Sequence, residues 1–141
     1  MVGGRLMDLG AVMQEIADQV DTIADLRVYG YPPDSVNAPA AIVTYPGSLD
    51  YDGSYGRGMD RIPDLTVVVL VGKVSERTAR DRIGQYCNGS GSASIKAVVE
   101  AGTYTEFDTV RVASVSFDIV LMGGVEYLAA TFTLDLAGQG A

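Results

Sequence analysis

The chain has 141 residues, of which 48% are hydrophobic and 20% are charged, so it can form a folded core and wholesale disorder is excluded. Its formal net charge is −8, which disfavours specific binding to nucleic-acid phosphates, although DNA can still slide through a negatively charged channel. Histidine is absent, which excludes the usual general base, the usual transition-metal ligand and any Ser-His or Cys-His nucleophile pair.

No apolar run approaches the ~20 residues that a membrane helix needs. The first ten residues lack a long apolar segment and therefore make a poor secretory signal. A single cysteine, Cys87, excludes an internal disulfide and is typical of a reducing cytoplasm. Its simplest role is that of a small core residue.

The first predicted element is an amphipathic helix that begins after Asp8, a suitable N-cap. Apolar residues then recur at helical spacing: Leu9, Val12, Met13, Ile16, Val20 and Ile23. Two short strands are predicted next, at Leu26–Tyr29 and Ala40–Tyr45, with a proline-rich connection between them.

The segment Gly47–Pro63 is predicted to be a long loop or an extended hairpin arm between two strands. Its tyrosines, Tyr51 and Tyr55, lie among glycines and serines, a composition typical of adaptable binding loops. Its acids are Asp50, Asp52 and Asp60. Carboxylates suit Ca²⁺ or Mg²⁺, but their spacing matches no EF-hand, which favours a solvated acidic loop and no metal site.

A strand covered on both faces is predicted at Val67–Val71, because this short apolar run is rich in β-branched residues and is bounded by Pro63 and Gly72; its periodicity alone also permits a buried helix. A charged helix is then expected to begin at Ser75 and to end at Asn88-Gly89. Its inner face consists of Ala79, Ile83, Tyr86 and Cys87.

The pair Gly72-Lys73 is similar to the end of a phosphate-binding loop. That motif requires a glycine at position 67 and a hydroxyl residue at position 74, where this chain has valines, so a strand-to-helix turn is favoured. A short third helix follows, with Ile95, Val98 and Val99 inward and its end at Gly102. Lys73, Arg77, Arg80 and Arg82 form a local basic cluster in which Glu76 and Asp81 are interleaved. This pattern favours a salt-bridged, solvated helix, and the alternative is a contact with an acidic neighbour such as another copy of this chain.

Gly123-Gly124 predicts a two-residue turn between two strands of roughly ten residues each. The turn pairs Met122 with Val125. In this register one face carries the apolar pairs Val115/Phe132, Phe117/Ala130 and Ile119/Leu128, and the other carries the mainly polar pairs Ser114/Thr133, Ser116/Thr131 and Asp118/Ala129. We expect the apolar face to pack on the helices and the other face to meet water or a partner. A bulge is predicted near Ala113, because the upstream valines are out of phase.

These elements predict an α+β fold with a mixed or largely antiparallel sheet of about four or five strands, packed against two or three helices. The chain is expected to form one domain over residues 1–141, with the arm at about 47–63 and the C-terminal hairpin at about 109–136.

Several segments together resemble a family of tail terminator or head–tail joining proteins from long-tailed phages of actinobacteria. The resemblance lies in LRVYGYPPDSVNAPAAIV, YDGSYGRGMDRI, LTVVVLVGKVSERTARDRI and GGVEYLAATFTLDL. It implies a non-enzymatic virion protein without a cofactor, assembled in the host cytoplasm, which forms a ring at the head-proximal end of the tail tube. The implied partners are other copies in a six-fold ring, the major tail tube protein, the head connector or stopper, and genomic DNA that passes through without specific binding.

In such a ring, the arm and the exposed hairpin face are expected to make the contacts between subunits or with the tube. The candidate contact residues are Asp50, Tyr51, Asp52, Tyr55, Arg57, Met59, Asp60, Arg61, Arg77, Arg80 and Tyr127. Three alternatives stay open: a head-completion or stopper protein beneath the portal, a small carboxylate-dependent enzyme, and a host-directed acidic binding module.

Overall fold

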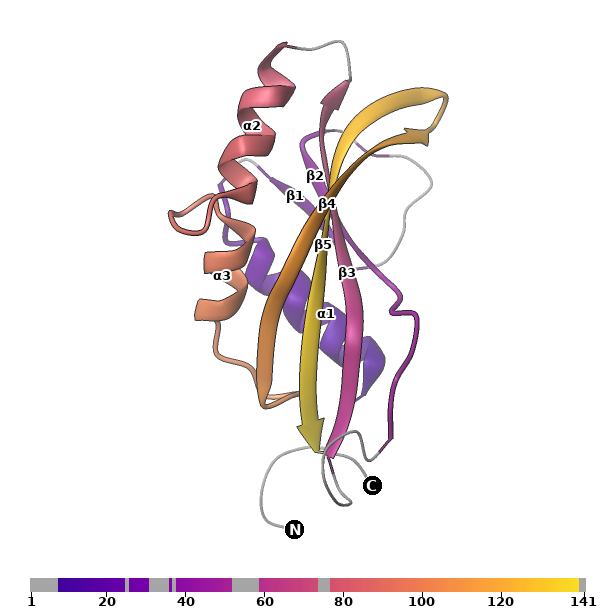
Figure 1. The fold of residues 1–141 in the computed structure, drawn as a ribbon, viewed down its shortest axis with the longest axis vertical. Coiled ribbons are helices and arrows are strands. Elements are labelled where there is room, and N and C mark those ends of the chain that lie inside the picture. The colour runs from indigo at the N-terminus through magenta and orange to yellow at the C-terminus, as the bar shows by residue number, and fades with distance from the viewer. Residues whose placement is uncertain are drawn as a thin grey trace.

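The computed structural model describes residues 8–24, 26–30, 36, 38–51, 59–73 and 77–139. Its elements are α1 (Leu9–Val20), β1 (Arg27–Tyr29), β2 (Ala40–Thr44), β3 (Met59–Lys73), α2 (Arg77–Cys87), α3 (Ile95–Ala101), β4 (Thr109–Met122) and β5 (Val125–Gln139). The five strands form one sheet in the order β1-β2-β3-β5-β4, in which the β1–β2 pair is parallel and the other pairs are antiparallel. The helices pack on this mixed sheet (Figure 1), which confirms the predicted α+β fold.

The helices begin and end close to the predicted residues. The Asp8 carboxylate accepts a hydrogen bond from the Gly10 N–H, and the Ser94 hydroxyl accepts one from the Ala97 N–H, so both residues act as N-caps. α1 ends at Val20, earlier than the apolar spacing implied, although Ile23 remains buried beyond it. The predicted cap at Ser75 lies outside the described residues.

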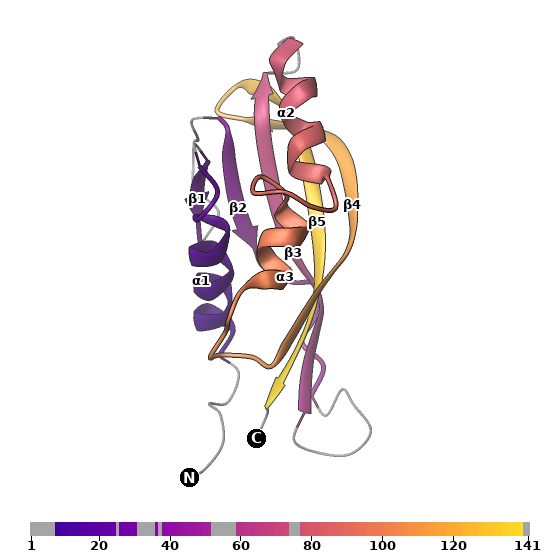
Figure 2. The same cartoon turned by 90° about the vertical axis from the view of Figure 1, so that its left-hand side faces the viewer.

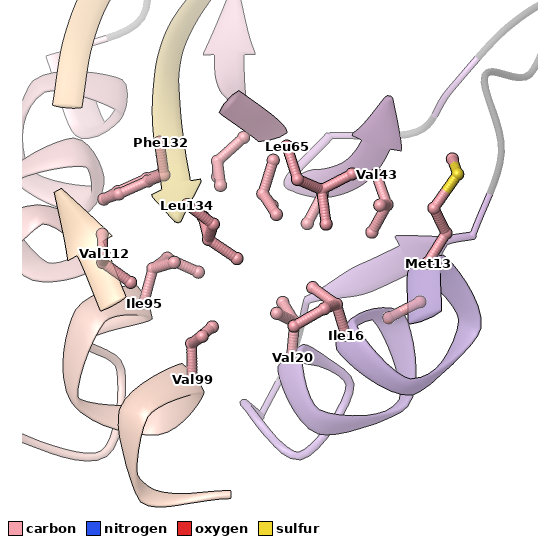
Figure 3. Packing of buried hydrophobic residues seen from close by; sticks show 14 of the residues in the cluster. Met13, Ile16, Val20, Val43, Leu65, Ile95, Val99, Val112, Phe132 and Leu134 are labelled. Atoms are coloured by element: carbon pink, nitrogen blue, oxygen red, sulfur yellow. The ribbon is translucent and has the colours of Figure 1, made fainter. Parts of the chain in front are cut away.

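The helices cover one face of the sheet (Figure 2). The main core lies between the helices and this face of the sheet, to which every second strand residue contributes a side chain. Figure 3 shows side chains from α1, α3 and β5 converging there: Ile16, Val20, Ile95, Phe132 and Leu134. β3 is the middle strand, and its Val67, Val69 and Val71 belong to this core.

A second, smaller cluster lies on the other face of the sheet, because its β2 and β3 members alternate with those of the main core. It consists of Val36, Ala40, Ile42, Leu70 and Ala129, with Tyr29, Val68, Val120 and Tyr127 packed against it. β3 is therefore buried on both faces, as its continuous apolar run predicted.

β3 is longer than predicted, because it begins at Met59 and so includes the last part of the expected arm. Pro63 does not end the strand. The pairing passes from Ile62 opposite Leu136 to Leu65 opposite Leu134, so Pro63 lies in a bulge where its missing N–H breaks no regular ladder bond. Residues 52–58 of the arm lie outside the described part of the chain.

Tyr104 closes the segment between α3 and β4. Its hydroxyl donates a hydrogen bond of 2.6 Å to the Val99 carbonyl, and its ring stacks on Phe107 with 4.4 Å between centroids. Burial, with a smaller contribution from the charge of Glu15, raises the pKa of Tyr104 to about 12. The folded state therefore favours the protonated phenol.

This pKa shift predicts a loss of stability at high pH. The stabilisation is fully present below the unfolded tyrosine pKa of about 10 and is lost as the pH rises through about 12. Because the ring is only half-buried, we expect a loss of roughly 1–2 kcal/mol over this window. Urea unfolding at pH 8, 10 and 11.5 checks it by comparison with Tyr104→Phe, which retains the ring. An equal pH dependence in both proteins would contradict the assignment.

Candidate assembly surfaces

The C-terminal hairpin turns at Gly123 and Gly124, whose φ angles are 59° and 80°. Two successive positive φ values define a type I′ turn, which matches the twist of the flanking strands and is readily adopted by Gly-Gly. Met122 lies opposite Val125, and all the predicted cross-strand pairs down to Ser114/Thr133 are present. The register shifts between Val112 and Ser114, which confirms the predicted bulge. The strands are longer than the expected ten residues, with 14 residues in β4 and 15 in β5.

The upper half of β4 exposes a row of large apolar side chains, which we call the hairpin row. Phe117, Ile119 and Leu121 are 59%, 51% and 69% exposed. They follow Val115 at a spacing of two residues and therefore point to the same side of the strand. The expectation that this face packs on the helices is correct for Phe132 but wrong for Phe117 and Ile119.

The bend of the hairpin explains the exposure of the row. Its upper part passes across the sheet, away from α2 (Figures 1 and 2). The opposite side of the hairpin, with Val120, Tyr127 and Ala129, then packs on the second cluster around Leu70. The side that was expected to meet water is thus partly buried, and the row lies on the outer surface.

The hairpin row also lies on an open strand edge, because β4 is the last strand of the sheet. In a two-residue hairpin the pair next to the turn is hydrogen-bonded, and such pairs alternate along the ladder. From Met122/Val125, this rule directs the backbone groups of Leu121, Ile119 and Phe117 away from β5. Consistently, the Ile119 N–H donates to the Asp118 carboxylate at 2.7 Å.

The root of the predicted arm lies at the other end of the molecule from the hairpin turn (Figure 1). Asp50 and Arg61 exchange two backbone hydrogen bonds of 2.7 and 2.9 Å. The Arg61 guanidinium also donates two hydrogen bonds, of 3.0 and 2.7 Å, to the Asp135 carboxylate. These bonds hold the pKa of Asp135 below its usual value and raise the pKa of Arg61.

The bulge of β3 helps to hold this root in place. The Asp64 carboxylate accepts hydrogen bonds from the backbone N–H groups of Gly47 and Ser48, at 3.1 and 3.3 Å. Beyond this support, Tyr51 is 75% exposed. The arm root therefore places one large aromatic side chain in solvent on a fixed backbone.

The eleven predicted contact residues do not form one surface. Asp50, Tyr51, Met59, Asp60 and Arg61 lie at the arm root, where Asp60 is buried; the side chain of Met59 is not among those described. Arg77 and Arg80 lie exposed on α2, and Tyr127 is half-buried in the hairpin. Asp52, Tyr55 and Arg57 lie outside the described residues.

Sequence reasoning missed the hairpin row as a surface. The two-residue alternation identified its side chains as apolar but could not show that they point outward. A usable signal was the small apolar face of the charged helix, which offers four residues to cover a long hairpin. Tyr45 is a second exposed aromatic that was not singled out.

A hollow of about 490 Å³ lies beside the end of α1 and is lined in part by Asp21, Thr22, Arg27 and Pro39. Among the described lining residues the charged groups are one acid and one base, which make no carboxylate pair. Within the described ranges, no three Asp, Glu or Cys side chains are grouped as a metal site would require. No described helix is both long enough and apolar enough to cross a membrane.

No model of a known protein family matches this chain. No curated protein matches it either.

Proposed function

We propose that this protein is a structural component of a phage virion that forms a ring at the head-proximal end of the tail tube. The ring would end polymerisation of the tube and join the tail to the head connector. The resemblance of the four quoted segments to tail terminator and head–tail joining proteins supports this function. The proposal concerns an assembly protein without enzymatic activity or a cofactor.

The observation that carries the proposal is the hairpin row. Three large apolar side chains are exposed together on one edge strand of a chain whose net charge is −8. Burying a side chain of this size contributes about 1.5–3 kcal/mol relative to leaving it exposed. Adjacent exposed apolar residues on an edge strand favour association, so a homo-oligomer is the state in which this surface would be covered.

The arrangement of the two ends also supports a joining role. The hairpin turn lies at one end of the molecule, and the arm root with Tyr51 lies at the other (Figure 1). A ring between tail tube and head connector needs two different contact surfaces, one towards each neighbour. In the proposed assembly the partners are other copies of this chain in a six-fold ring, the major tail tube protein and the head connector. Genomic DNA would pass through the lumen without specific binding.

Native mass spectrometry of the purified protein at micromolar concentration provides the first test. The expected result is a closed oligomer of about six copies, held by heterologous contacts. A protein that stays monomeric over this range, with or without tail tubes, would contradict the proposal. A monomer that changes its state with Mg²⁺ would instead favour a carboxylate-dependent enzyme.

Co-sedimentation with purified tail tubes and with DNA-filled heads provides the second part of the test. A terminator is expected to bind one end of the tube, as electron microscopy would show. Binding to filled heads and not to tubes would overturn the terminator assignment and identify a stopper. Tyr51→Ser is expected to weaken binding to one neighbour without preventing ring formation, whereas Tyr45→Ser, which removes an exposed tyrosine outside the Asp50–Arg61 bridge, is the control.

A further inference from the structure

We propose that the hairpin row of one copy docks on helix α2 of the next copy. This inference rests on the proposed function, because it assigns the contact that would build the ring. The two surfaces belong to different parts of the same chain, so the contact is heterologous and can repeat around a ring.

Acidic side chains lie beside the hairpin row. Glu126 is directly opposite Leu121 in the ladder and therefore shares its face, and it is exposed. Asp118 lies at the strand edge, where its carboxylate accepts the Ile119 N–H. The surface that covers this row must therefore tolerate apolar contact and carry positive charge.

Helix α2 concentrates the positive charge of this acidic chain. Of the ten Lys and Arg residues in the chain, four fall between positions 73 and 82: three on α2, and Lys73 at the end of β3. Arg77 and Arg80 are exposed at i and i+3 on one side of the helix, with Asp81 beside them, and we call these two arginines the basic face of α2. Arg82 is exposed on another side of the helix. By contrast, Arg61 and Lys96 elsewhere are held at 2.7 Å by Asp135 and Glu100.

The charges of the basic face are available for a partner. Arg80 is 3.9 Å from its neighbour Asp81, and both side chains are at least 70% exposed, so their attraction is weak. Arg77 and Arg82 form no ion pair with any described residue. Arg77 and Arg80 therefore add little to the stability of the isolated subunit and remain free to attract an acidic surface.

Arginine side chains suit the hairpin row in a second way. Their aliphatic stems cover apolar surface while the guanidinium stays hydrated. A guanidinium also stacks on the face of an aromatic ring such as that of Phe117. The basic face can therefore cover the hairpin row and neutralise Glu126 in the same contact.

The positions of the two surfaces fit a repeating contact. Both lie at the end of the molecule where β3 finishes, with α2 and the hairpin on different sides of that strand (Figures 1 and 2). Pairing two β4 edges instead would make an isologous dimer, which brings equal acidic flanks together and leaves α2 unused. Asp118 also already occupies one of the N–H groups that such pairing needs.

A charge swap tests this contact. Arg80→Glu and Glu126→Arg are each expected to weaken ring formation about fivefold to tenfold per interface, because an attraction becomes a repulsion. The double variant should recover to within about threefold of the wild type, since the pair is restored in reverse. Sedimentation velocity at low and high salt measures this, and the differences should shrink at high salt.

Matched controls carry equal charge changes elsewhere. Arg27→Glu lies on β1 and Asp108→Arg lies before β4, and both residues are exposed. These variants should form rings like the wild type. Ile119→Ser should weaken association, and circular dichroism should show that it remains folded, because its side chain is 51% exposed.

The outcomes separate this contact from the function. If the Arg80→Glu and Glu126→Arg variants form rings and bind tubes as the wild type does, the docking contact is overturned and the proposed function stays intact. A dimer that depends on Ile119 but not on Arg80 would identify pairing of two β4 edges and also overturn it. A wild-type monomer that binds neither tubes nor heads would overturn both.

Discussion

Replacing Phe132 by alanine is expected to lower the free energy of unfolding by about 3–5 kcal/mol. Phe132 is 2% exposed and is the bulkiest of the fully buried side chains. It lies on β5 between Val67 of β3 and Val115 of β4, above the α3 residues of the core (Figure 3). The truncation leaves a cavity that the surrounding structure cannot fill, because the cross-strand pairing of β3, β5 and β4 holds these strands in place. Urea unfolding followed by circular dichroism measures the loss.

Phe117→Ala is the matched control for this truncation. It removes the same atoms from the adjacent strand, but Phe117 is 59% exposed in the isolated subunit. In the monomer, Phe117→Ala should lower the free energy of unfolding by less than about 1 kcal/mol. Its effect on ring formation should exceed that of Phe132→Ala when both variants are compared as folded protein. Equal destabilisation by the two changes would contradict the assignment of Phe117 to the outer surface.

Replacing Glu15 by alanine is also expected to have a large effect, because it should lower the free energy of unfolding by about 2–3 kcal/mol. The Glu15 carboxylate on α1 accepts backbone hydrogen bonds from the Thr105 N–H, at 3.0 and 3.2 Å, and from the Glu106 N–H at 2.8 Å. It also accepts a bond from the Thr105 hydroxyl at 3.1 Å. These bonds join α1 to the segment that leads into β4, 90 residues later. Hydrogen bonds to charged groups contribute about 1.5–3 kcal/mol, and Glu106 is buried, so its N–H would be left without this partner.

Glu15→Gln separates the hydrogen bonds from the charge. The glutamine carbonyl can still accept one of the backbone hydrogen bonds. The free energy of unfolding should therefore fall by about half as much as in Glu15→Ala, or by less. Hydrogen exchange at Thr105 and Glu106 should rise strongly in Glu15→Ala and weakly in Glu15→Gln. A neutral Glu15→Ala variant with unchanged exchange would show that the segment holds its place without α1.

The local elements of this fold could be read from the chain because their signals are local. The spacing of Val12 and Ile16 predicts a helical face, Asp8 and Ser94 supply caps, and Gly123-Gly124 sets a turn that fixes the hairpin pairs as far as Ser114/Thr133. The bulge near Ala113 follows from a change of phase in the same pattern. These features depend on residues fewer than about 20 positions apart.

The extent of β3 and the arm was harder to predict. Pro63 and the glycines before it are loop signals, yet pairing with β5 extends the strand back to Met59. That pairing is made by residues more than 70 positions away, such as Ala137 opposite Arg61. Tertiary pairing overrode the local preference at a bulge that tolerates a proline.

The sequence by itself determined which hairpin side chains share a face, because a two-residue turn and a period of two leave one register. It did not determine which face meets solvent. That was decided by the bend of the hairpin over the second cluster, where Val120 and Tyr127 pack on Leu70. The physical reason is that strand twist and the reach of the helix layer are properties of the assembled sheet. The resulting exposure of Phe117, Ile119 and Leu121 is what directs the assembly proposal to the hairpin.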